Sequence, residues 1–296
     1  ILAVNLITAH IQRFTLSRKK LGIWLIHSSI LVLLIGGAIS GWVSTESQMA
    51  LTEGQKSWYS QSLRKTELVV VVPDETGEMA RRLTYDLDAL NTGDSIQLGP
   101  LQMRITEKLA NSRVRLIADA DRRPADFRGA GHYFSYEPLA IDRRPDGQNF
   151  PLITVALDSA SYMLTTHLQP LQQVQTTPAG QPVLIGLQPT RYYFPYSVHL
   201  VDFTHQKYPG TTIPSYFSSD VIIKDGDVLL PYHIYMNHPL RYGGITYFQA
   251  SFDASETVSI LQLVKNPVWW VPYISCLVLA IGLIWHSIIM LRRTPS

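Results

Sequence analysis

The uncharged stretch Leu21–Val43, LGIWLIHSSILVLLIGGAISGWV, constrains the fold more than any other part of the chain. About 20 apolar residues are enough for a helix to cross the hydrocarbon core of a bilayer, and this stretch reaches that length. Basic residues precede it, including Lys19 and Lys20, whereas no comparable cluster follows it. By the positive-inside rule, the sequence predicts a transmembrane helix over 21–43 that begins in the cytoplasm and ends on the outer side.

One ionisable residue lies inside this stretch. His27 comes seven residues after Lys20, which places it about 10 Å into the helix. Ionisable side chains are rare in transmembrane helices and usually functional, and a neutral imidazole is a good axial ligand for haem iron. We therefore predict that His27 binds a metal. The structural alternative is a hydrogen bond to a neighbouring serine or a backbone carbonyl.

Two glycines of the same stretch predict contact with another helix. Gly37 and Gly41 form a small-xxx-small pair, which permits close helix approach. His27 and Gly41 are fourteen positions apart and so lie about 40° from each other around the helix axis. We expect the histidine face to be a packing face as well.

A second transmembrane helix is predicted over 268–291, VWWVPYISCLVLAIGLIWHSIIML. Aromatic residues typical of a membrane interface stand at its beginning: Trp269, Trp270 and Tyr273. Arg292 and Arg293 follow it, which predicts a cytoplasmic C-terminus. His286 is a weaker candidate metal ligand, and we expect it at a depth in the membrane similar to that of His27. The favoured interpretation of His286 is a histidine at the membrane interface beside Trp285.

The rest of the chain is divided around these two stretches. We expect residues 1–12 to be the tail of an upstream transmembrane helix, 13–20 a cytoplasmic loop, 44–267 an outer domain and 292–296 a cytoplasmic tail. Short apolar or alternating runs separated by turn formers predict a mostly antiparallel β domain, either a sandwich or an open barrel. These runs are 67–72, 81–87, 95–109, 113–118, 152–157, 161–168, 182–187, 197–203, 220–223, 228–236, 245–250 and 257–264. A short amphipathic helix is expected within 47–61.

Composition excludes several classes of function. The net charge of +2 is too close to neutral to indicate a nucleic-acid partner. Cys276 is the one cysteine, so the chain can form neither an internal disulfide nor a CxxC redox pair. No nucleophile elbow, P-loop or dinucleotide fingerprint is present. No histidines of the outer domain are spaced as zinc ligands are. The favoured interpretation of His199 is a strand residue whose imidazole forms hydrogen bonds within the protein. Arginines of two DRRP segments, 121–124 and 142–145, can meet carboxylates, although a solvated loop is the default.

The final third of the chain resembles the ResB family, also called CcsB. The resemblance is carried by Val201-Asp202-Phe203, by Tyr208-Pro209-Gly210-Thr211, by the segment Pro214–Ser219, and most specifically by Met236–Gly244 with Tyr247–Ser251. Lys265-Asn266-Pro267 also fits the family. So do the helix that contains His27 and the segment Leu51–Gln55.

This resemblance implies a role in the cytochrome c biogenesis system that uses a two-part membrane synthase. It implies a CcsA-type partner that carries the tryptophan-rich haem-handling motif, which this chain lacks. It also implies that haem b is held in the membrane, with His27 as an axial ligand, and exported for thioether attachment to CxxCH motifs of apocytochrome c. The chain would then be a non-catalytic or co-catalytic subunit in the inner membrane, with its large domain on the periplasmic side.

Two other readings stay open. The chain can be a membrane-anchored β scaffold in a respiratory or assembly complex, with no haem of its own. It can also be a solute- or lipid-binding β domain on an anchor, which would require a large apolar cavity.

Overall fold

The structure is a computed structural model. It describes residues 1–12, 17, 20–73, 80–98, 101–117, 127–144, 147–157, 160–168, 172–175, 182–253 and 257–292. The basic residues expected at 13, 18 and 19, the first DRRP segment and Arg293 lie outside these ranges. The chain forms two compact units. One comprises Ile1–Glu46, Asp202–Asp220 and Tyr232–Ser296, and the other comprises Ser47–Val201 and Val221–Pro231.

The described elements are three α-helices, two 3-10 helices and a series of strands. The helices are α1 (Leu2–Gln12), α2 (Leu21–Val43), α3 (Val271–Leu291), η1 (Leu87–Ala89) and η3 (Gly129–His132). The strands are β1 (Thr45–Thr52), β2 (Lys56–Pro73), β3 (Ala80–Asp86), β4 (Ser95–Leu98), β5 (Leu101–Leu109), β6 (Ser112–Leu116), β7 (Phe127–Arg128), β8 (Phe134–Pro138), β9 (Leu152–Leu157), β10 (Ala160–Thr165), β11 (Gln172–Gln175), β12 (Pro182–Lys207), β13 (Pro214–Asp225), β14 (Val228–Tyr235), β15 (Leu240–Tyr242), β16 (Ile245–Phe252) and β17 (Val258–Lys265).

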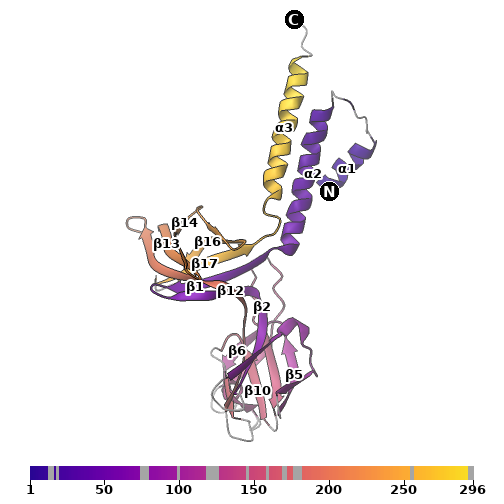
Figure 1. Ribbon diagram of the computed structural model, residues 1–296. Helices are drawn as coiled ribbons and strands as arrows, with labels where there is room; N and C mark the ends of the chain where they lie inside the picture. The colour runs from indigo at the N-terminus through magenta and orange to yellow at the C-terminus, as the bar shows by residue number, and fades with distance from the viewer. Residues whose placement is uncertain are drawn as a thin grey trace. The chain divides into compact units, whose positions relative to one another are not determined.

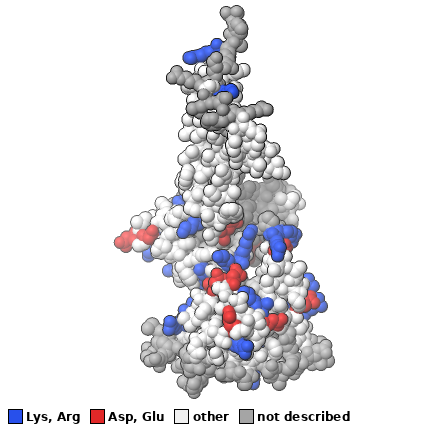
Figure 2. Space-filling model, turned by 90° about the vertical axis from the view of Figure 1, so that its right-hand side faces the viewer, with Lys and Arg blue, Asp and Glu red and all other residues white. Residues whose placement is uncertain are grey.

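Two helices are long and apolar enough to cross a membrane, judged by length and composition. They are α2, with a mean hydropathy of 2.0, and α3, with 2.3. They lie side by side, and α1 contacts α2 (Figure 1). Most of their side chains are exposed rather than buried in a protein core. Figure 2 shows no Lys, Arg, Asp or Glu along the helix pair between its ends.

The helix bounds follow from local chemistry. The helix α2 has the range predicted from the sequence, Leu21–Val43. The helix α3 begins at Val271, three residues later than expected, because the side chain of Asn266 accepts a hydrogen bond from the backbone N–H of Val268 and holds 268–270 in a turn. Pro272 then occupies the first helical turn, where its missing N–H has no helical partner to lose.

Three antiparallel strands precede α3 in the same unit. The strands β15, β16 and β17 pair in sequence order. The hydroxyl groups of Ser219 on β13 and Ser259 on β17 lie 2.7 Å apart. Ser219 also donates a 2.7 Å hydrogen bond to the side chain of Gln249 on β16.

The second unit is a β-sandwich. One sheet contains β2 with the antiparallel neighbours β1, β3 and β12, and the other has the order β4-β5-β9-β10-β7. A single buried cluster takes side chains from both sheets, including Leu68 and Ile185 from the first and Met103, Val155 and Leu164 from the second. The predicted mostly antiparallel β domain is therefore confirmed. The β7–β10 pair is parallel.

One local expectation is wrong. Residues 47–61 are not helical: 47–52 belong to β1 and 56–61 to β2, and a turn joins the two strands, which pair through Ser47 and Ser62. Their alternating burial suits a half-buried strand better than a helix. The runs 182–187 and 197–203 are parts of one long strand, β12. Its register against β2 shifts just after Pro189 and again around Pro195, because proline has no N–H to donate to the neighbouring strand.

Candidate functional site

The two apolar helices pack through small residues. The buried residues of α2 are Gly22, Ser29 and Gly36, spaced seven apart, and those of α3 are Val271, Ser275 and Gly282. A seven-residue spacing keeps these positions on one stripe of a helix. A Cβ atom on Gly22 would lie 2.7 Å from the Cβ of His286, and one on Gly36 would overlap the side chain of Val271. The helices therefore run antiparallel and approach too closely for larger side chains at these glycines.

Gly37 and Gly41 do not form the contact between these helices. A Cβ atom at either position would have no neighbour within 4 Å among the described residues. Instead, α3 packs on the stripe of Gly22, Ser29 and Gly36. That the histidine face packs against another helix stays a prediction. At 100° per residue, Gly37 and Gly41 lie roughly 60–100° around the axis from Gly22.

His27 is half-buried on α2. It follows Gly22 by five residues, which turns it about 140° around the helix axis from the stripe that meets α3. The imidazole therefore projects from the side of α2 that α3 leaves uncovered.

His286 lies at a different level from His27. Its Cβ is against Gly22, five residues before His27, so the two histidines are separated by about 7 Å along the pair. The expectation of similar depth is corrected, because the close contact of Gly22 with Gly282 fixes the offset between the helices. The Nδ1 atom of His286 is buried and has no hydrogen-bond partner among the described residues.

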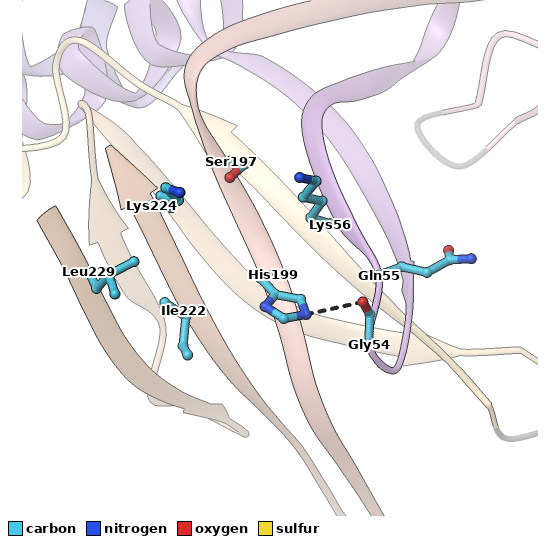
Figure 3. Close-up of a pocket in the computed structure, with 8 residues that line it drawn as sticks. All are labelled: Gly54, Gln55, Lys56, Ser197, His199, Ile222, Lys224 and Leu229. Atoms are coloured by element: carbon cyan, nitrogen blue, oxygen red, sulfur yellow. Dashed lines mark hydrogen bonds between the residues drawn. The ribbon is translucent and has the colours of Figure 1, made fainter. Parts of the chain in front are cut away.

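A hollow on the sheet of the second unit gathers cationic and apolar side chains. Its volume is about 640 Å³. Eight residues line it, drawn in Figure 3: Gly54, Gln55, Lys56, Ser197, His199, Ile222, Lys224 and Leu229. Successive side chains of a strand point to opposite faces, so residues two apart share a face. Ser197 and His199 on β12 and Ile222 and Lys224 on β13 are such pairs.

His199 fixes one wall of this hollow. Its Nε2 lies 3.1 Å from the carbonyl oxygen of Gly54, the contact drawn in Figure 3. The backbone N–H of Gly54 donates to Leu200, and that of Leu200 donates to Gln55. Gly54 has φ +77°, a conformation that favours glycine. His199 is therefore a satisfied strand histidine, as expected, and it holds the turn that leads into Lys56.

A second hollow of about 420 Å³ adjoins the first. The two share Lys56, Ser197 and Lys224. The second adds aromatic walls and a turn: Trp58, Phe194, Pro195, Tyr196 and Gly226. This site was not predicted from the sequence, because its residues come from four separate segments and only strand pairing brings them together.

A hydrogen-bonded chain of side chains in the first unit was also missed. The hydroxyl of Tyr216 lies 3.0 Å from Nε2 of His233, and Nδ1 of His233 lies 2.7 Å from Asp220. The side chains of His233 and Asp220 are nearly half exposed. The alternating pattern of each strand, β13 and β14, indicated which residues of that strand share a face. The register that pairs the two strands could not be predicted from the sequence. Within the described ranges, no group of three or more His, Cys, Asp or Glu residues could hold a metal ion.

In the second DRRP segment, Arg144 and Asp142 form an ion pair with each other. Nη2 of Arg144 lies 2.6 Å from Asp142, and its Nε and backbone N–H also donate to that carboxylate. Chiefly through the side-chain bonds, Arg144 lowers the pKa of Asp142 from 3.8 to about 2. Arg144 is therefore already engaged, and its availability for another carboxylate is reduced.

The chain was compared with known proteins. A model of the ResB-like family matches residues 172–261, a range that contains the segments on which the resemblance rested most heavily. Protein NrfI of Wolinella succinogenes is 27% identical over 292 residues, which cover 97% of this chain and 29% of that protein. The predicted resemblance to the ResB family is confirmed. The chain spans less than a third of the length of this relative.

Proposed function

We propose that the protein is a component of the membrane machinery that attaches haem to apocytochrome c, because residues 172–261 match a model of the ResB-like family. The family match is the observation that carries this proposal. The proposed role is to hold haem b as cargo within the membrane and to support its delivery to CxxCH motifs on the outer side. The chain acts as a non-catalytic or co-catalytic subunit of the synthase.

His27 is the proposed axial ligand of the haem iron. It is half-buried in an apolar helix, and its position turns it away from α3. A neutral imidazole with an apolar surrounding suits ferrous or ferric haem, since the surrounding excludes water and tunes the iron. In this proposal a further helix completes the haem site beside His27.

A CcsA-type membrane protein is the proposed source of that helix. The part of α2 around Gly37 and Gly41 has space for it, because no described atom lies within 4 Å of a Cβ at either glycine. In this arrangement α2 and α3 span the inner membrane. Lys20 and Arg292 lie on the cytoplasmic side and the β strands lie in the periplasm, where they support the partner and apocytochrome c.

Haem content tests the ligand assignment. We expect His27→Ala to lower the Soret absorbance of the purified complex by about tenfold or more, since losing even an outer-shell contact weakens metal binding by 10–100-fold. Added imidazole should restore part of the absorbance. His286→Ala is the matched control, because it removes the other histidine of the helix pair and should leave most of the haem in place.

Two outcomes would contradict the proposal. Unchanged haem in His27→Ala, with an intact β domain by circular dichroism, would reject His27 as the ligand. A complex with its partner that never shows a Soret band would instead favour the membrane-anchored β scaffold without haem.

A further inference from the structure

We propose that the two adjoining hollows of the second unit form one binding site for a ring-bearing organic anion, with Lys56 and Lys224 as the anion-binding groups. The site does not use His27 or the helix pair. The proposal therefore stands or falls independently of the haem ligand.

The first support is uncompensated positive charge. Lys56 and Lys224 line both hollows, and in the view of Figure 3 Ser197 lies between them. Neither lysine forms an ion pair within the described parts of the chain. The carboxylates of the adjacent turn, Asp225 and Asp227, line neither hollow. Two ammonium groups and a hydroxyl that line the same hollow are well suited to an anionic head.

The second support is the apolar lining on either side of this point. Ile222 and Leu229 line the first hollow together with the flat imidazole of His199. Three aromatic residues, Trp58, Phe194 and Tyr196, line the second. Phe194 and Tyr196 are stacked with ring centres 5.5 Å apart, and Trp58 remains about half exposed. Aromatic walls of this kind pack well against a flat ring.

The third support is that the walls are already held in place. Lys56 is directly opposite His199 in the register of β2 and β12. The bond from His199 to Gly54 and the backbone bonds of the turn fix the start of β2. A volume of about 640 Å³ lies within the 300–1,000 Å³ typical of small-molecule sites. The ligand class is therefore a compact ring system that carries a carboxylate, phosphate or sulfonate.

A pair of probes that differ in one group tests this assignment. The anion is 1-anilinonaphthalene-8-sulfonate, and its neutral counterpart is N-phenyl-1-naphthylamine, which has the same rings without the sulfonate. Binding of each to the full chain in nanodiscs of zwitterionic lipid would be measured by calorimetry, with empty nanodiscs subtracted. The wild type should bind the anion at one saturable site, and added salt should weaken that binding.

The variants then identify the groups. We expect Lys56→Gln with Lys224→Gln to weaken binding of the anion by about tenfold or more, because hydrogen bonds between charged groups are stronger than those between neutral groups. Binding of the neutral probe should be unchanged. Lys65→Gln is the matched control, since Lys65 is an exposed lysine of the same strand that lines neither hollow. Trp58→Ala should weaken both probes.

Three results would overturn the proposal. The first is an anion affinity that is equal in the wild type and in the double variant. The second is an equal loss for both probes in the double variant, which would indicate an apolar hollow without anion selectivity. The third is an equal loss in Lys65→Gln, which would indicate general surface charge. Because Lys56 and Lys224 are exposed, thermal unfolding of the variants should match that of the wild type.

Discussion

Glu67 and Gln188 illustrate, at the scale of single residues, how the sandwich accommodates a buried charge. They face each other across β2 and β12, and Nε2 of Gln188 donates a 2.6 Å bond to the Glu67 carboxylate. Glu67 is 8% exposed. Arg82 approaches the same carboxylate to 3.8 Å from β3. A buried carboxylate needs such partners, because unpaired polar groups in a protein interior are costly.

Removing the amide should therefore destabilise the sandwich. We expect Gln188→Leu to lower the free energy of unfolding by about 1–3 kcal/mol, the usual cost of leaving a buried acceptor unsatisfied. Chemical denaturation of the full chain would measure it. Gln102→Leu, on the exposed face of β5, is the control and should change stability by less than about 0.5 kcal/mol. Equal effects of the two variants would contradict this role of Gln188.

Asp142 gives a prediction about pH. Its pKa is lowered from 3.8 to about 2 by Arg144, so the folded loop binds the proton less tightly than the unfolded chain does. The stabilisation is thus complete above pH 4 and is lost as the pH falls from about 4 to about 2. Carboxyl NMR titration should give this pKa, and Arg144→Gln should return it toward the ordinary value of about 3.9. A pKa that does not move in Arg144→Gln would contradict the assignment.

At the scale of elements, the helix pair depends on which glycine faces α3. Gly36 meets Val271, whereas its neighbour Gly37 meets nothing within 4 Å in the described chain. The two positions have similar helical surroundings, so the same substitution at each separates packing from helix propensity. Leucine favours the helix over glycine by a similar amount at both.

We expect Gly36→Leu to separate α2 from α3 and to destabilise the pair by about 1–3 kcal/mol, the typical cost of overpacking. Gly37→Leu should leave the pair intact. Cysteine cross-linking between α2 and α3 would report the separation, with thermal unfolding of the same variants as a second measurement. In the complex with its partner, Gly37→Leu should instead weaken association if the face with His27 binds another helix. Loss of cross-linking in Gly37→Leu alone would reverse this assignment.

At the scale of the whole molecule, the proposed topology places both charged ends of the helix pair on one side of the membrane. In a Cys276→Ser background, we expect Lys20→Cys and Arg292→Cys to resist a membrane-impermeant maleimide applied to intact spheroplasts. Lys265→Cys, on the exposed end of β17, should react. Permeabilisation should expose all three. Labelling of Lys20→Cys but not Lys265→Cys in intact spheroplasts would indicate the opposite orientation.

Features that depend on local composition were predictable from the sequence. Hydropathy is a property of a continuous stretch, so the bounds of α2 and most of α3 were readable, as were the mostly antiparallel β class and the lack of an internal disulfide. The motifs in 201–251 pointed to the family because they are continuous in the chain. Single strands such as β9 and β17 were also predictable, because each has a short alternating or apolar run.

Which surfaces meet depends on long-range packing and was not predictable from the sequence. Gly36 and Gly37 are equally small, and the choice between them depends on where α3 lies, which no pattern within α2 encodes. The depth of His286 depends on the offset between the two helices, which is fixed by the contact of Gly22 with Gly282. Lys56, Ser197 and Lys224 are separated by many residues and come together through the register of β2, β12 and β13. Strand register and helix offset are set by long-range packing, and for that reason the site on the sheet could not be read from the chain alone.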